Sequence, residues 1–143
     1  MTNAISVKER LKKQAIEDGK TMQDKLVTFG LERTIYRLSV SKYAEKFTLK
    51  GGIFLYALFD GEYARATMDI DLLAQHIPND AEEMKNVFND IFSIKCDDAL
   101  RFDLNTLKVI NITEFIMIIP LKRHGGKTQK AGCKYITLVI GIL

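Results

Sequence analysis

One stretch constrains this chain of 143 residues more than any other, and it runs from position 49 to position 73 as LKGGIFLYALFDGEYARATMDIDLL. Two glycines, Gly51 and Gly52, open it. An apolar run follows, and then come Asp69 and Asp71, which stand one residue apart. Because the second half of the stretch otherwise has the composition of a buried strand, the two carboxylates need a reason to be there.

The two aspartates predict a metal site. Alternate residues of a strand face the same side, so Asp69 and Asp71 would point together while Ile70 and Leu72 point into the core. Two adjacent carboxylates repel each other and stay charged only beside a positive group. Mg²⁺ or Mn²⁺ suits this role, because hard divalent cations prefer carboxylate oxygens and also bind substrate phosphates. Arg65 would lie on the same face, where it could take phosphate charge.

The glycine pair predicts a phosphate-binding turn next to that metal. Glycine lets the backbone approach a bulky anion closely, and the amides at the start of a following helix can hold phosphate. An isolated Gly-Gly is usually only a turn, and an isolated D-x-D is usually a surface turn or a strand end. Here the two occur together in the order strand, Gly51-Gly52, helix, strand, and this order favours the functional interpretation.

The rest of the chain indicates an α/β fold with a small sheet. Apolar spacing at Val7, Leu11 and Ala15 predicts a first helix that ends near Gly19. Further elements are expected as helices at 22–39, 52–59 and 80–93, as strands at 46–50 and 65–73, and as one or two strands within 100–113. Asn79, with Glu82 three residues later, is the expected cap of the third of these helices.

Composition limits the function classes. The net charge of +3 and the two distant cysteines permit a nucleic-acid partner and suit a reducing cytoplasm. The charged start of the chain does not look like a signal peptide, and no apolar run reaches the ~20 residues of a membrane span. We therefore expect a cytoplasmic protein without a membrane partner.

The end of the chain differs from the rest. Residues 121–134 carry five basic residues and no acid, and the segment YITLVIGIL at 135–143 is uncharged. We divide the chain into a core with N-terminal helices at 1–116 and an atypical basic, then apolar, tail at 117–143. An apolar strand in that tail needs a partner, and a homodimer is one way to provide it. Three acids could supply a further carboxylate, Asp97 and Asp98 in an expected loop and Asp103.

Residues 7–115 resemble the AbiEii/AbiGii family of nucleotidyltransferase toxins from abortive-infection and toxin–antitoxin systems. The family pattern is an L-K-G-G turn followed by R-x-T-x-D-I-D-L. This chain has both parts, as Leu49-Lys50-Gly51-Gly52 and as Arg65-Ala66-Thr67-Met68-Asp69-Ile70-Asp71-Leu72. The segment ALRFDLNTLKVINITEF at 99–115 is also similar to the family's next segment.

The resemblance implies a DNA polymerase β-like nucleotidyltransferase fold, with a small mixed sheet flanked by helices. It implies transfer of a nucleotide from an NTP to an acceptor, with tRNA as a candidate acceptor, and a cognate antitoxin as partner. By motif match, Gly51 and Gly52 would hold the triphosphate, while Asp69 and Asp71 would be catalytic and would hold Mg²⁺ or Mn²⁺. Supporting nucleotide-binding roles would fall to Lys50, Arg65 and Thr67.

The chain also departs from the family pattern. Family members continue with a strand that carries a third carboxylate and with a helical C-terminal region, so we expect a fold that is incomplete at its C-terminus. If Ile140-Gly141 matches the family's D-I-G, Val139 stands in place of the aspartate. One alternative is therefore an inactive remnant that acts only as a binding or assembly module. A D-x-D sugar-nucleotide transferase is a weaker alternative, because such enzymes usually need a larger nucleotide-binding domain.

Overall fold

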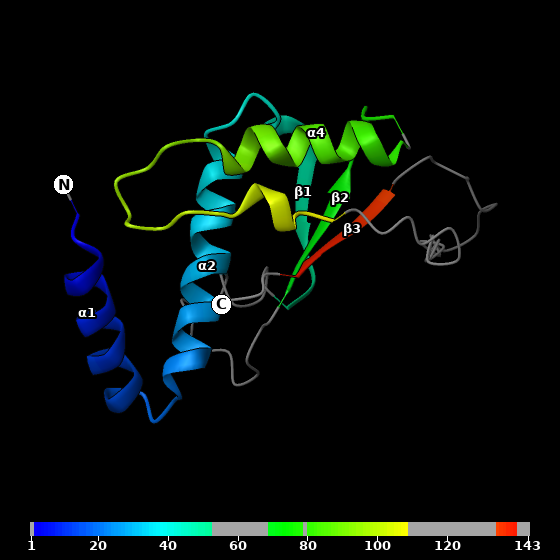
Figure 1. The fold of residues 1–143 in the computed structure, drawn as a ribbon. Coiled ribbons are helices and arrows are strands. Elements are labelled where there is room, and N and C mark those ends of the chain that lie inside the picture. The colour runs from blue at the N-terminus through cyan, green and yellow to red at the C-terminus, as the bar shows by residue number, and fades with distance from the viewer. Residues whose placement is uncertain (1, 53–68, 79, 109–133, 140–143) are drawn as a thin grey trace, which may run out of the picture.

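A computed structural model describes residues 2–52, 69–78 and 80–108, together with the backbone of 134–139. The described part is a mixed α/β structure (Figure 1). Its helices are α1 (Ala4–Glu17), α2 (Met22–Ser39) and α4 (Ala81–Phe92), and its strands are β1 (Phe47–Lys50), β2 (Asp69–Ala74) and β3 (Lys134–Val139). Two short 3₁₀ helices, at Ala44–Lys46 and Leu104–Thr106, lie between these elements.

Helices α1 and α2 form a hairpin, and α1 stands beside α2 on the side away from the sheet (Figure 1). The expected stripe of Val7, Leu11 and Ala15 is the buried face of α1. The chain leaves α1 through Gly19, whose φ of 62° lies in the left-handed region that favours glycine. Helix α1 therefore ends near the predicted Gly19, and α2 begins and ends at the residues expected for it.

The described strands form an antiparallel sheet in the order β1-β2-β3. The register pairs Lys50 with Asp71 across β1 and β2, and Asp69 with Val139 across β2 and β3. Both described pairings are antiparallel, which differs from the mixed sheet that the resemblance implies. Strand β3 comes from the atypical tail, so the apolar segment of that tail has a partner strand within the same chain.

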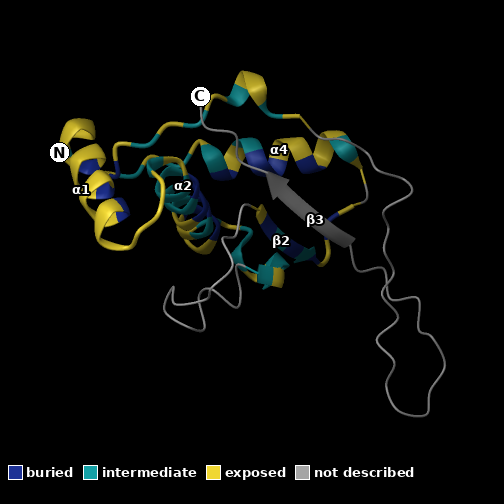
Figure 2. Cartoon of the chain, turned by 90° about the horizontal axis from the view of Figure 1, so that it is seen from below, coloured by how far each residue is buried: buried dark blue, intermediate teal, exposed yellow. Residues whose placement is uncertain are grey.

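The hydrophobic core lies between one face of the sheet and the helices α2 and α4 (Figure 2). Leu31 of α2, Ile70 and Leu72 of β2, and Ile91 of α4 are all fully buried. Full burial of such a side chain contributes roughly 1.5–3 kcal/mol, so this layer fixes which face of β2 points inward. The other face of β2 carries Asp69, Asp71 and Leu73.

One local prediction was wrong, and another is not met within the described residues. The cap of α4 is Asp80 and not Asn79, because the Asp80 side chain accepts a hydrogen bond from the backbone N–H of Glu83. No strand forms within 100–108, the part of the expected strand region that is described. Instead, the Asp103 side chain accepts from the N–H of Asn105 at 3.0 Å and begins the 3₁₀ turn.

Some predicted elements lie outside the described residues, namely most of the helix at 52–59, the first part of the strand at 65–73, and residues 109–113. Among the helices that the structure describes, none has the length and apolar composition needed to cross a membrane.

Candidate functional site

Antiparallel pairing brings the glycine turn and the aspartates to the same end of the sheet. Strand β1 ends at Lys50, and Gly51 and Gly52 follow it directly. Strand β2 begins at Asp69, and its third residue, Asp71, lies opposite Lys50. Residues separated by a long stretch of sequence are therefore neighbours in space. This juxtaposition is the one that the sequence pattern predicted.

The two aspartates lie on the face of β2 that points away from the core. Ile70 and Leu72 have no exposed surface, whereas Asp69 is exposed and Asp71 is half-buried. This alternation follows the period of two along a strand and confirms the expected direction of the carboxylates. Both carboxylates are thus held on one surface by a strand that the core fixes in place.

Gly51 and Asp71 are packed too closely for any other residue to replace the glycine without a shift. A Cβ atom built on Gly51 would overlap Oδ2 of Asp71 and would lie 3.2 Å from its Cγ and 3.3 Å from its Cβ. Gly51 also has a φ of 69°, which L side chains rarely adopt. Steric room and backbone conformation therefore both require glycine at the turn, which lies directly against a carboxylate.

The donor set fits a hard divalent cation that also binds a ligand. Asp69 and Asp71 offer carboxylate oxygens, the donors that Mg²⁺ prefers. Among the described residues, no group of three or more His, Cys, Asp or Glu side chains could hold a metal ion. Mg²⁺ commonly uses one or two protein carboxylates together with water and substrate phosphates, so a pair is sufficient for that kind of site.

The neighbouring strand adds no acid at this place. The position opposite Asp69 on β3 is Val139, and the position opposite Asp71 is Thr137. Val139 is the residue that would replace an aspartate if Ile140-Gly141 matched the D-I-G pattern described above. The register therefore puts position 139 directly beside the carboxylate pair.

Several predicted residues lie outside the described part of the chain. Arg65 and Thr67 are among them, as are residues 121–133 of the basic segment. Lys134, the last basic residue of that segment, is the first residue of β3. The predicted supporting roles of Arg65 and Thr67 remain predictions.

The spare acids considered as further ligands are engaged elsewhere. Asp97 accepts a hydrogen bond from the backbone N–H of Thr2, and Asp103 caps the 3₁₀ turn. Asp98 is buried and bound to two arginines of α2. These contacts give each acid a structural role.

The Asp98 cluster was not predicted. Oδ2 of Asp98 lies 2.8 Å from Nη1 of Arg37 and 2.7 Å from Nε of Arg33, and the Arg37 side chain is only 2% exposed. Burial works to raise the pKa of Asp98, but hydrogen bonds from Arg37 and Arg33 outweigh burial and hold the pKa at about 2. The available signal was an arginine next to Leu38 on the buried face of the second helix.

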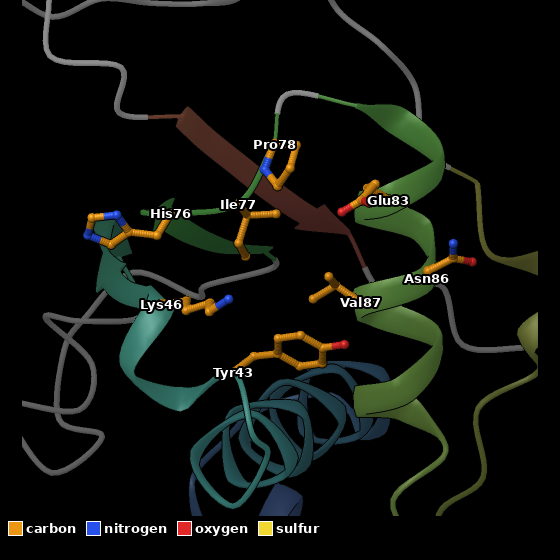
Figure 3. Close-up of a pocket in the computed structure, with 8 residues that line it drawn as sticks. All are labelled: Tyr43, Lys46, His76, Ile77, Pro78, Glu83, Asn86 and Val87. Carbon is orange, nitrogen blue, oxygen red and sulfur yellow. The ribbon is translucent and has the colours of Figure 1, made fainter.

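A cavity of about 180 Å³ lies at the other end of β1 and β2, away from the glycine turn. Figure 3 shows Tyr43 and Lys46 on one side of it and Glu83 and Val87 of α4 on the other. None of the predicted site residues lines it. His76, at its edge, has a φ of 56°, a conformation that is uncommon outside glycine.

Comparison with known proteins identifies a family for the chain. Residues 33–126 match the model of a family described as the nucleotidyl transferase AbiEii toxin of a type IV toxin–antitoxin system. This range covers more than half of the chain and includes Gly51, Gly52, Asp69 and Asp71. Searches of curated proteins and of solved structures returned no significant match.

Proposed function

This chain belongs to the family of nucleotidyl transferase AbiEii toxins of type IV toxin–antitoxin systems, and we propose that it binds an NTP together with a divalent metal ion and transfers a nucleotide to an acceptor. The observation that supports the proposal most strongly is the close packing of Gly51 against Asp71. It places a glycine turn, a kind of backbone suited to phosphate, directly against a carboxylate suited to metal.

Each residue of the site has a specific role in this proposal. The backbone at Gly51 and Gly52 holds the triphosphate, and Asp69 and Asp71 hold Mg²⁺ or Mn²⁺. When bound, the metal neutralises phosphate charge and stabilises the oxygens of an in-line displacement. Arg65 and Thr67, which lie outside the described residues, are proposed to support the nucleotide.

The proposed acceptor is a hydroxyl group of an RNA, with tRNA as the first candidate. A net charge of +3 is compatible with a polyanionic partner, although it does not select one. Membership of a toxin–antitoxin family also implies a cognate antitoxin.

A labelled-transfer assay tests the proposal. The purified chain is incubated with each α-³²P-labelled NTP and total tRNA, with Mg²⁺ or with EDTA. We expect Mg²⁺-dependent label on RNA that is lost in Asp69→Asn and in Asp71→Asn. Asp90→Asn is the matched control, because Asp90 is an exposed acid of α4 whose side chain pairs with Lys42. Equal transfer by the wild type and by the two site variants would contradict the assignment.

One observation favours a second candidate function, which is nucleotide binding without transfer. Position 139, opposite Asp69, carries valine, so this neighbour supplies no carboxylate that could assist deprotonation of an acceptor. In this case the protein would bind NTP with Mg²⁺ but leave every acceptor unlabelled. Measuring binding and transfer on the same preparation separates the two functions.

A further inference from the structure

Lys50 lies where it can interact with both halves of the site. It is the last residue of β1, it directly precedes Gly51, and it is the register partner of Asp71. Directly opposed residues of an antiparallel pair have Cβ atoms about 4.5–5.5 Å apart on the same face of the sheet. The Lys50 side chain therefore starts next to the Asp71 carboxylate.

The burial pattern of β1 places Lys50 on the carboxylate face. Leu49 packs against the core and lies opposite the buried Leu72, while Thr48 is exposed. Because side chains alternate along a strand, Lys50 shares the outer face with Thr48, and Asp71 lies on that same face. Lys50 itself is half-buried.

The positive charge of Lys50 affects both the carboxylate pair and any cation that approaches it. Three register neighbours of the two aspartates are defined, Lys50, Thr137 and Val139, and Lys50 is the charged one among them. Two carboxylates side by side repel each other, and a nearby ammonium group offsets that repulsion. The same ammonium group repels a divalent cation that approaches the pair. A lysine stem is flexible, however, and can move its charge by several ångströms.

We propose that Lys50 is an exchangeable counter-ion of the candidate site. Without ligand it offsets the charge of the Asp69–Asp71 pair, and when metal and nucleotide arrive it turns to the triphosphate beside Gly51. This inference rests on the proposed function and deepens it, because it makes metal binding depend on nucleotide binding. The metal alone is held weakly, and the NTP strengthens its binding by removing the ammonium group from the pair.

The proposal predicts effects of opposite sign in one variant. Lys50→Met keeps the length of the stem and removes the charge. Mn²⁺ without nucleotide, measured as the loss of the free-ion electron paramagnetic resonance signal, should bind about threefold or more tighter, because a repelling charge is gone. The Mg²⁺ complex of the preferred NTP, measured by calorimetry, should bind about tenfold weaker, because a charged contact to phosphate is lost.

Two further variants control the result. Lys50→Arg keeps the charge and should stay within about threefold of wild type for both ligands. Lys46→Met removes a lysine at the other end of β1, beside the cavity, and should change neither affinity. Circular dichroism confirms that each variant is folded.

Several outcomes would overturn the proposal. Weaker binding of both ligands by Lys50→Met would indicate a structural role, and unchanged binding of both would indicate no role. If wild type binds Mg²⁺–NTP and Lys50→Met behaves like it, the inference fails while the proposed function stands. If wild type binds neither Mn²⁺ nor any Mg²⁺–NTP, the proposed function fails, and the inference fails with it.

Discussion

The carboxylate of Asp71 occupies the space that a side chain at Gly51 would need. One residue comes from the turn after β1 and the other from the third position of β2, and the antiparallel register brings them together. A glycine that is required by contact with a carboxylate differs from a glycine that is required by a turn alone. This difference can be measured, because the described residues include one glycine of each kind, Gly51 and Gly19.

Gly51→Ala should lower stability more than Gly19→Ala does. Both glycines have a positive φ, but a Cβ on Gly19 meets nothing within 4 Å, whereas one on Gly51 meets Asp71. We expect Gly19→Ala to cost roughly 1–2 kcal/mol from backbone strain alone. We expect Gly51→Ala to cost roughly 1–3 kcal/mol more from overpacking, and to weaken Mg²⁺-dependent NTP binding. Urea denaturation measures the loss of stability. Equal losses in the two variants would show that the contact between position 51 and Asp71 is unimportant.

Val139→Asp should strengthen metal binding. Position 139 lies directly opposite Asp69, so an acid there adds a third carboxylate to the pair. Because added ligand charge raises the affinity of a site for a hard cation, we expect severalfold tighter Mn²⁺ binding. Tyr135→Asp is the matched control on the same strand, since position 135 lies opposite Leu73 and four residues away. A similar gain in both variants would indicate a general charge effect and would count against the register.

Asp98→Ala should be one of the most damaging substitutions of an acid in the described part of the chain. It leaves the Arg37 guanidinium buried without its carboxylate partner. Removing one partner of a buried pair typically costs about 3–5 kcal/mol. Asp90→Ala removes an acid whose pair with Lys42 is exposed, so it should cost far less stability than Asp98→Ala. Urea denaturation at pH 7 compares the two, and similar losses would show that the buried cluster adds little stability.

The same cluster should stabilise the fold only while Asp98 is charged. The folded pKa of about 2 lies below the ordinary value of 3.8, so the contribution is fully present above about pH 4 and is lost as the pH falls toward 2. The difference corresponds to roughly 2 kcal/mol. A carboxyl-carbon NMR titration of the wild type should find Asp98 still ionised at pH 3. A midpoint near pH 4 would mean that the arginines do not control this group.

The geometry of the candidate site was predictable because its signals are local. A period of two from Asp69 to Leu72 determines which side chains point outward, and the core residues Ile70 and Leu72 enforce it. The glycine turn could be recognised for a similar reason, since a positive φ next to a close contact leaves few residue choices. The position of Val139 opposite Asp69 needed the structure, because strand register is a long-range property.

The sequence failed to predict two kinds of feature. In one kind, two local structures compete for the same residues, and in the other, residues far apart in the sequence come into contact. Asn79 and Asp80 are each followed by Glu three residues later, so the sequence alone did not decide which one caps α4. Between 100 and 108, where a strand was expected, the Asp103 side chain instead accepts a hydrogen bond from the backbone N–H of Asn105. The Arg37–Asp98 pair joins residues 61 positions apart, which no periodicity can indicate.

Calorimetric titration of the purified chain with each NTP, first with Mg²⁺ and then with EDTA, tests the central claim most directly. The claim is that Gly51, Asp69 and Asp71 form one metal-dependent triphosphate site. We predict binding of at least one NTP in Mg²⁺ that disappears in EDTA and in the Asp69→Ala/Asp71→Ala double variant. If the folded wild type binds no NTP, or if the double variant binds as tightly as the wild type, the claim is wrong.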